Sequence, residues 1–294
     1  MQNQKKSYDI AVAYRICPKV ADVASPFPGA DDKYRLSEIC LRSFKDSLGG
    51  LRARIWALMD DCPAKYADLF SKYFDPDDLT LLNLGGIGNH ATFRRQIEIL
   101  LEQQDSRVVY FAEDDYLYLP GQFRCMVEFL LEHADAHFVS PYDHLDCYTM
   151  ELHREPKWLK VHGGRHWRTA SSTCLTFLTR KETLEKTQTA FHNYKRRSLD
   201  CSIWLSLTKR RVFNPYFVFR HLFRDRLFSK VVLKSWLYCW QQILFGRKWK
   251  LWVPIPAVAT HLDAKALSPN VEWRSLMEQA NRQTQEEIRV TKCS

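Results

Sequence analysis

The sequence lacks several patterns that would place a protein in a specialised class. Its nine cysteines include no pair spaced C-x-x-C, so neither a zinc site nor a disulfide framework is predicted. No window of 18 or more uncharged apolar residues occurs, and no membrane-spanning helix is expected. The opening residues lack the apolar core of a signal peptide, and no internal repeat or low-complexity tract is present. These absences favour a protein of the reducing cytosol.

The composition is that of a folded globular protein with a basic balance. The 294 residues suffice for one large α/β domain or two small ones, and hydrophobic residues make up 46% of the chain. There are 43 Lys and Arg residues against 34 Asp and Glu residues, which gives a net charge of +9. A basic protein attracts nucleic acid, anionic lipid or phosphorylated substrates, and the total charge does not choose among them.

Short apolar runs and amphipathic helical patterns alternate along the first half of the chain. Strands are expected at 8–14, 52–59, 79–84 and 108–112, with a loop at 24–32. The helices between and after them are expected to begin at Ser37, at Pro63, after the turn 85–89 and after Pro120. This βαβα order predicts a mainly parallel sheet with right-handed crossovers.

The second half of the chain is less regular. Its expected elements are a strand at 137–140, a loop at 157–169, a strand at 173–178, helices at 181–191 and 198–207, an extended piece at 212–219 and a polar terminal helix from 270.

Three consecutive carboxylates follow the most apolar run. Residues 108–112 show no polar alternation, which is typical of a strand buried on both faces, and Glu113, Asp114 and Asp115 follow directly. Side chains alternate along an extended strand end, so Glu113 and Asp115 should point one way and Asp114 the other. Such acids repel one another unless a cation lies among them, and Mg²⁺ or Mn²⁺ prefers oxygen ligands completed by phosphate. The alternative is a solvated acidic loop.

Three further features each allow two interpretations. The turn 85–89 (Gly-Gly-Ile-Gly-Asn) would let backbone amides approach a phosphate, or it is a tight turn that needs positive φ. Asp60 and Asp61 would hydrogen-bond a base or ribose, or cap the helix that follows them. Arg94 and Arg95 lie in a first helical turn, where cations oppose the macrodipole, so they indicate an anionic partner or are a solvated pair.

The stretch 110–120 (Tyr-Phe-Ala-Glu-Asp-Asp-Tyr-Leu-Tyr-Leu-Pro) resembles the D-x-D segment of GT-A-fold glycosyltransferases, in a Glu-Asp-Asp form. The turn and helix around Asn89 resemble the glycine loop of family 2 members, and Asp60-Asp61 resembles their base-binding acids. The resemblance covers roughly the first 130 residues in order and spacing. It implies that Asp115 carries the metal that bridges the sugar-nucleotide diphosphate.

The same resemblance implies a set of substrate-binding residues. Glu113 and Asp114 would face ribose and sugar, and because the first acid is Glu rather than Asp, its contact with the metal stays open. The rest of the expected set is Arg15, Asp60, Asp61, Asn89, Arg95 and Arg165. Arg165 belongs to the loop 157–169, which would cover substrate or is a plain surface loop.

Two roles in the second half also follow from the resemblance. Inverting members use an acid at a helix start as general base, and the counterpart here is Asp200, with Asp143 as its competitor. The alternative for Asp200 is an ordinary acid in a first helical turn. The family also places a late histidine at the metal or diphosphate, which points to His261 as a second metal ligand unless that histidine is structural.

The stretch 220–252 interleaves Lys and Arg with Trp, Leu, Ile, Val and Phe. Basic residues with tryptophan at both ends are typical of a helix that lies on anionic lipid. A core helix with a basic outer face is the first alternative. Single-stranded nucleic acid stacked on the aromatic rings is the second.

These patterns together predict one GT-A-like (Rossmann-like) α/β domain with a mainly parallel central sheet flanked by helices. Residues 1–135 would bind the nucleotide-sugar, 136–265 the acceptor, and 266–294 form a terminal helix or tail. The expected activity is transfer of a sugar to a hydroxyl of a glycan or glycolipid, with inversion and with Mn²⁺ or Mg²⁺. The alternatives are a sugar-nucleotide nucleotidyltransferase and a non-catalytic basic protein that binds nucleic acid or membrane. We expect a cytoplasmic protein, peripheral at the inner face of a membrane.

Overall fold

A computed structural model describes residues 7–19, 32–196, 198–214, 216, 218–219, 226–263 and 265–293. Most of the expected loop at 24–32, and residues 220–225 of the basic stretch, lie outside this described part. The strands are β1 (Ile10–Ile16), β2 (Ala53–Met59), β3 (Leu79–Asn83), β4 (Val108–Glu113), β5 (Tyr116–Tyr118), β6 (Phe138–Val139), β7 (Leu159–His162), β8 (Arg165–Ala170), β9 (Phe177–Arg180), β10 (Leu251–Ile255) and β11 (Ala259–His261).

The helices alternate with the strands in the first half and cluster in the second. They are α1 (Lys33–Ser47), α2 (Lys65–Tyr73), α3 (Asn89–Glu102), α4 (Phe123–Glu132), α5 (Asp146–Thr149), α6 (Lys181–His192), α7 (Asp200–Thr208), α9 (Arg226–Leu244) and α10 (Trp273–Cys293). Short 3₁₀ turns lie at Pro76–Asp78, Glu151–His153 and Asn193–Arg196.

One large sheet runs through both halves of the described chain, in the order β3-β2-β1-β4-β9-β6-β10-β8-β7. The first four strands pair with one another in parallel, as the βαβα order predicts. β9 and β8 are antiparallel to the other seven strands of this sheet. The predicted fold class, an α/β protein with a mainly parallel central sheet flanked by helices, is confirmed.

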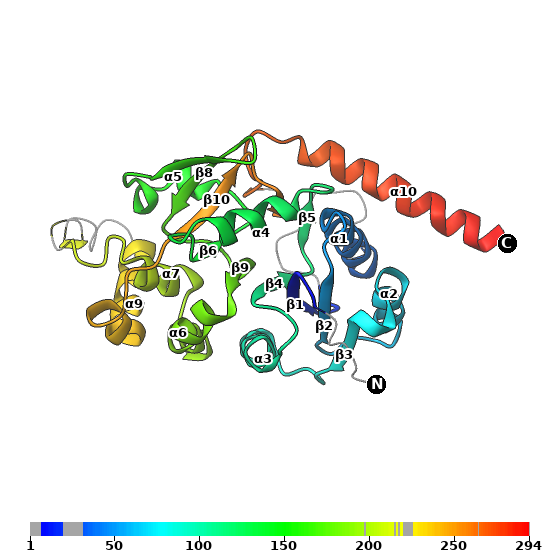
Figure 1. The fold of residues 1–294 in the computed structure, drawn as a ribbon, viewed down its shortest axis with the longest axis horizontal. Coiled ribbons are helices and arrows are strands. Elements are labelled where there is room, and N and C mark those ends of the chain that lie inside the picture. The colour runs from blue at the N-terminus through cyan, green and yellow to red at the C-terminus, as the bar shows by residue number, and fades with distance from the viewer. Residues whose placement is uncertain are drawn as a thin grey trace.

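Helices cover both faces of this sheet, as Figure 1 shows. Val108, Tyr110 and Ala112 of β4 pack in one core with α1, α2 and α4, while Val109 and Phe111 pack in another with α3, α6 and α7. The unalternating apolar run is therefore a strand buried on both faces, as expected. Its carboxyl end delivers the three acids to the edge of the sheet.

Residues 157–169, expected as a loop, form most of a β-hairpin at the far edge of the sheet. β7 and β8 pair antiparallel through a turn at Gly163 and Gly164, whose φ angles are +58° and +70°. Two glycines with positive φ are the signature of a tight hairpin turn, which the expectation overlooked. Trp167 is fully buried and stacks on Phe129 with ring centroids 4.0 Å apart. This segment is therefore a hairpin of the large sheet rather than the loop that the sequence predicts.

Two other expected elements are also corrected. The first helix begins at Lys33, and its cap is Asp32, whose Oδ1 accepts from the amides of Tyr34 and Arg35. Ser37 lies buried inside that helix and is not its cap. Its hydroxyl instead donates to a residue of the site described below. The piece expected to be extended at 212–219 is helical at its described residues 216 and 218–219.

α9 and the chain after it carry the basic and aromatic residues of 226–252. Its inner face packs on α7, where Phe228, Val231, Val232 and Ile243 form a separate core. The helix is kinked at Cys239, whose backbone angles are not helical. Among the described residues, no helix combines the length and the apolar character needed to cross a membrane.

Candidate functional site

A cleft of about 510 Å³ lies at the carboxyl edge of the parallel strands. This is the edge at which open α/β sheets bind their ligands. Strand ends, the glycine turn and the loop after β11 supply its walls, which include Arg15, Lys19, Lys33, Asp60, Asp61, Gly86, Gly88, Asn89, Glu113, Asp114, Asp115 and His261. The structure thus brings together eight of the expected site residues: Arg15, Asp60, Asp61, Asn89, the three acids of the triplet and His261.

Asp115 and His261 meet because β5 pairs with β11. The ladder sets His261 opposite Tyr116, and the amide of Leu262 donates to the carbonyl of Asp115 at 2.8 Å. The imidazole Nε2 then lies 3.1 Å from Oδ2 of Asp115. The other carboxylate oxygen, Oδ1, is buried and has no hydrogen-bond partner within the protein. A buried acceptor without a donor costs free energy, so this atom indicates a ligand.

The two side chains hold each other in their charged forms. Burial opposes ionisation of Asp115, but the charge and hydrogen bond of His261 outweigh it, and the pKa of Asp115 falls to about 2. Burial likewise disfavours the imidazolium, yet Asp115 raises the pKa of His261 to about 9. At neutral pH the pair is therefore an ion pair on the cleft wall.

Glu113 is held on the other side of the triplet by Arg15 and Thr176. Its Oε1 forms an ion pair with Nη2 of Arg15, and its Oε2 accepts from the Thr176 hydroxyl at 2.7 Å. The second guanidinium nitrogen of Arg15 donates to the side chain of Asn89. Asn89 in turn donates to the Tyr194 hydroxyl at 3.3 Å. This network links the ends of β1 and β4 to the start of α3.

Asp114 points toward α1, away from its two neighbours. Its Oδ2 lies 2.8 Å from Nζ of Lys33 and accepts from the Ser37 hydroxyl at 3.2 Å. The amide of Cys17 also donates to it at 3.4 Å. Burial raises the pKa of Asp114, against the opposing charge of Lys33. These contacts make Asp114 an anchor between the triplet and α1.

The glycine turn is closed by Asp60 rather than left open. The amides of Ile87 and Gly88 donate to the two carboxylate oxygens of Asp60 at 2.7 and 2.8 Å. An anion does lie at the start of α3, as the turn predicts, but it is the chain's own carboxylate. Asp61, with φ of +58°, lies beside Gly86 and faces the cleft. Neither acid caps the helix after Pro63, because α2 has no side-chain cap.

Arg94 and Arg95 form ion pairs with an acid on their own helix. Glu98 lies 2.9 Å from Nε of Arg94 and 3.2 Å from Nη1 of Arg95. The two arginines lie in the second turn of α3 rather than the first, because the helix begins at Asn89, and this intrahelical pairing accounts for both. Arg95 is not among the residues that line the cleft. The expected role of Arg95 in substrate binding therefore finds no geometric support here.

Asp200 lies at the start of α7 and lines a second cavity of about 230 Å³. Burial raises the pKa of its carboxyl, against a hydrogen bond from the amide of Cys201; the charges of Glu113 and Arg15 also act on it. The second cavity is therefore within electrostatic reach of the first. Its lining includes the polar Ser172 and Thr173 and the apolar Leu227 and Val231 of α9.

Two expected site residues are bound into the scaffold instead. Asp143 is 1% exposed, forms an ion pair with Arg168 and accepts from the Tyr148 hydroxyl at 2.5 Å. Both of its oxygens are thus engaged away from the cleft. Arg165 on β8 donates to the Pro256 carbonyl and, at 2.7 Å, to the Gln122 side chain. It joins the hairpin to the chain around it rather than facing substrate.

Asp115 and His261 are the residues that could hold a divalent cation. The described residues contain no cluster of three or more His, Cys, Asp or Glu side chains arranged around one point. Mg²⁺ and Mn²⁺ commonly need only one or two protein ligands when substrate phosphates complete their shell. The two side chains line the cleft, and the unpartnered Oδ1 of Asp115 supplies a free oxygen donor, so the pair fits such an ion.

Three contributors to the site were not expected from sequence. Lys33 begins α1, Thr176 precedes the short strand β9, and Tyr194 lies in the 3₁₀ turn after α6. None belongs to a motif, and each reaches its partner only through the fold. A lysine directly after the N-cap acid Asp32 was the one signal available, since a cation there opposes the helix dipole.

Comparison with known proteins finds no protein-family model and no curated protein that matches the sequence. Solved structures with partial similarity include galactosyltransferase LgtC in complex with donor and acceptor sugar analogs, at 8% identity and a TM-score of 0.45, over 93% of this chain and 95% of that one. A putative nucleotide-diphospho-sugar transferase from Desulfovibrio desulfuricans G20 has 11% identity and a TM-score of 0.42, over 80% and 98%. A 4-diphosphocytidyl-2C-methyl-D-erythritol synthase from Anaerococcus prevotii DSM 20548 has 12% identity and a TM-score of 0.40, over 71% and 86%. Similarity this low does not assign an activity, so the residues of the site must do so.

Proposed function

We propose that the protein transfers a sugar from a nucleotide-sugar donor to a hydroxyl group of a glycan or glycolipid, with the help of Mn²⁺ or Mg²⁺. The observation that carries the proposal is the buried, unpartnered Oδ1 of Asp115, held beside His261 on the wall of a 510 Å³ cleft. A carboxylate and an imidazole at the carboxyl edge of a parallel sheet suit a cation that a diphosphate completes.

The charges around the cleft support a diphosphate ligand. Arg15, Lys19 and Lys33 lie on its walls together with the acids, and these cations would attract phosphate oxygens. The pKa of about 9 at His261 means that a metal must displace a proton there, which makes metal binding weaker as the pH falls. Asp61, exposed on the cleft rim, is our candidate for contact with base or ribose.

The second cavity supports an acceptor with a polar end and an apolar end. Its lining combines Asp200, Ser172 and Thr173 with apolar residues such as Leu227 at the beginning of α9. A glycan hydroxyl would lie at Asp200, with a lipid chain against the apolar residues. Burial raises the pKa of Asp200, and this higher pKa makes its carboxylate a stronger base once it is ionised.

In the proposed reaction the acceptor oxygen attacks the anomeric carbon of the sugar. That C–O bond forms while the bond from the anomeric carbon to the terminal phosphate oxygen breaks, and the nucleoside diphosphate leaves with the bonding electrons. Asp200 takes the proton of the acceptor hydroxyl. A bound cation would stabilise the charge on the leaving diphosphate. Attack from the side opposite the leaving group gives inversion.

The outer face of α9 supports work at a membrane surface. Leu233, Leu237, Trp240 and Leu244 are each 46–68% exposed and recur at the spacing of one helical face. Lys and Arg flank them, and residues 226–252 contain no acid. An apolar stripe with basic neighbours fits an anionic lipid surface, and we propose that surface as its partner.

A thermal-shift screen of nucleotide-sugars with and without Mn²⁺ tests the donor site. We expect one nucleoside diphosphate or its sugar to raise the melting temperature only with the metal, because a ligand at 100 times its Kd stabilises by about 2.7 kcal/mol. Stabilisation by oligonucleotide alone would contradict the proposal. A positive screen followed by release of pyrophosphate from a nucleoside triphosphate and a sugar phosphate would identify a nucleotidyltransferase instead.

A further inference from the structure

A further cavity, lined mostly by basic residues, lies at the C-terminal end of α7, opposite the end that carries Asp200. The turn after α7, residues 209–214, forms one side of it, and Glu155 and Lys248 complete it, around a volume of about 450 Å³. α7 has nine residues, so its two ends are about 13 Å apart. None of the residues that line this pocket lines the donor cleft or the cavity at Asp200.

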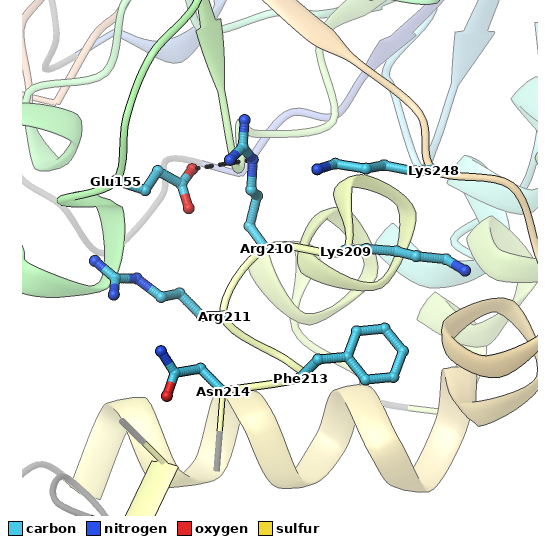
Figure 2. Close-up of a pocket in the computed structure, with 7 residues that line it drawn as sticks. All are labelled: Glu155, Lys209, Arg210, Arg211, Phe213, Asn214 and Lys248. Atoms are coloured by element: carbon cyan, nitrogen blue, oxygen red, sulfur yellow. Dashed lines mark ion pairs between the residues drawn. The ribbon is translucent and has the colours of Figure 1, made fainter. Parts of the chain in front are cut away.

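Four cationic side chains and one carboxylate, that of Glu155, line this pocket. Lys209, Arg210 and Arg211 come from three successive positions of the turn, and Lys248 comes from the segment before β10. Figure 2 shows Glu155 and Lys248 on either side of the Arg210 side chain. The arrangement depends on the tertiary fold, because the amide of Trp249 donates to the Leu207 carbonyl at 2.9 Å and brings Lys248 beside the turn.

Glu155 does not balance this charge. Its carboxylate lies 3.8 Å from Nε of Arg210 and 3.5 Å from Nζ of Lys157, so one negative charge is shared between two cations. Partial burial and, next, the charge of Arg210 lower the pKa of Lys248. Among the residues that line the pocket, four carry a positive charge and one a negative charge, so the pocket would attract an added anion.

The turn that carries three of these cations has an unusual backbone. Lys209 and Arg211 both adopt left-handed conformations, with φ of +50° and +60°. Side chains other than glycine adopt this conformation rarely, and here two such residues flank Arg210. Favourable interaction with the C-terminus of α7 accounts for cations on the turn, but not for Lys248, which lies about 40 positions further along the chain.

We propose that this pocket binds a phosphate group. Guanidinium groups offer several donors to phosphate oxygens, and two lysines add compact positive charges, which suits a group with more than one negative oxygen. The phosphate could belong to the headgroup of an anionic lipid or to a soluble phosphorylated molecule, and the chemistry of recognition is the same. The site goes beyond the proposed transfer reaction, since it needs neither the metal nor the nucleotide.

The test uses the Lys209→Gln/Lys248→Gln double variant of the full chain. Its control is Lys186→Gln/Arg124→Gln, which removes two exposed cations elsewhere, on α6 and α4. Binding of pyrophosphate is measured by calorimetry in EDTA, where the donor cleft has no metal to bridge a diphosphate. Binding to phosphatidylcholine vesicles with and without phosphatidic acid is measured by sedimentation. The Lys209→Gln/Lys248→Arg variant, which keeps the charge at position 248, should bind more tightly than Lys209→Gln/Lys248→Gln.

We expect the double variant to lose affinity for at least one probe by about tenfold or more, with the control unchanged. Loss in the vesicle arm alone identifies a lipid headgroup as the source of the phosphate. Loss in the pyrophosphate arm, alone or with the other, identifies a site open to soluble phosphate. Metal-dependent nucleotide binding should stay at the wild-type level in all variants, which separates this site from the donor cleft. If the double variant binds both probes as the wild type does, the proposal is wrong.

Discussion

The side chains of Asp115 and His261 lie 3.1 Å apart although 146 positions separate them in the chain. Their contact depends on the two-stranded pairing of β5 with β11, which is separate from the nine-stranded sheet. The core contacts of the large sheet therefore do not depend on the carboxylate of Asp115. Function and folding can be tested independently at this residue.

We expect Asp115→Asn to abolish metal-dependent nucleotide binding while the protein stays folded. An amide supplies at most one neutral oxygen to the cation and no charge, so the ligand set is lost. Calorimetric titration of nucleotide with and without Mn²⁺ measures the effect. Asp46→Asn is the matched control, because Asp46 is an exposed acid on α1 with only a distant partner at 3.9 Å. If Asp115→Asn bound nucleotide with wild-type, metal-dependent affinity, Asp115 would not be a metal ligand.

Asp200→Asn should slow turnover by roughly 10²–10⁴-fold, the usual contribution of a positioned acid–base group. Donor affinity should stay near the wild-type value, because the proton transfer occurs in the transition state. Since burial raises the pKa of Asp200, the base ionises at higher pH than an ordinary aspartate, and turnover should rise with pH through that value. Single-turnover rates across pH report both effects. Unchanged turnover in the variant would exclude Asp200 as the base.

Asp143→Asn should instead lower the free energy of unfolding, by about 3–5 kcal/mol. The variant leaves Arg168 buried without its carboxylate, and Arg168 is 4% exposed. Urea denaturation measures the loss, and turnover is compared at a temperature where the variant is folded. Normal stability together with abolished turnover would return Asp143 to the role of base.

Leu233→Ser/Leu237→Ser should weaken sedimentation with anionic vesicles without lowering the melting temperature. Both leucines are more than 60% exposed on α9, so their removal opens no cavity in the core. Added salt should release the wild type, because the basic neighbours contribute by charge. Leu131→Ser, at a leucine 51% exposed on α4, is the control. Equal vesicle binding by all three proteins would exclude this helix as the membrane contact.

Stability should fall as the pH is lowered from about 6.5 toward 4, in part through His137. Burial and then the charge of Arg247 lower the pKa of His137 to about 4, so the unfolded chain binds a proton in this window and the folded chain does not. Its Nδ1 accepts from the amide of Lys250 at 3.0 Å, which protonation would break. His137→Asn keeps an acceptor without a charge, and its stability should depend less on pH in urea titrations. An unchanged slope would contradict this account.

Local patterns were enough to predict the first half of the fold and many of the residues that line the 510 Å³ cleft. Strand β4 and its three acids were predictable because an unalternating apolar run and a carboxylate triplet are both local signals. Lys33 and Thr176 were not, because each reaches the triplet through packing between distant segments. The misread loop at 157–169 shows a different failure: the pair Gly163-Gly164 carried the hairpin signal, but its polar flanks hid it.

The roles of the acids also depended on facts that spacing does not contain. Asp143 and Asp200 are similar in sequence terms, since each precedes a short helix, yet one is neutralised by Arg168 and the other faces a cavity. Sequence patterns give no information on which buried acid finds a cation. The partner of Asp143 is set by β8, whose register places Arg168 opposite Val253 and within reach of Asp143.

The closure of the glycine turn by Asp60 affects how ligand binding would be driven. Because the carboxylate already binds the amides of Ile87 and Gly88, the turn is ordered by the chain itself. Association then does not have to supply the conformational entropy of fixing this wall of the cleft, and more of the contact energy remains as affinity. The cleft is preorganised on this side. Its selectivity for a ligand would therefore depend on the shape of a fixed wall rather than on a segment that folds upon binding.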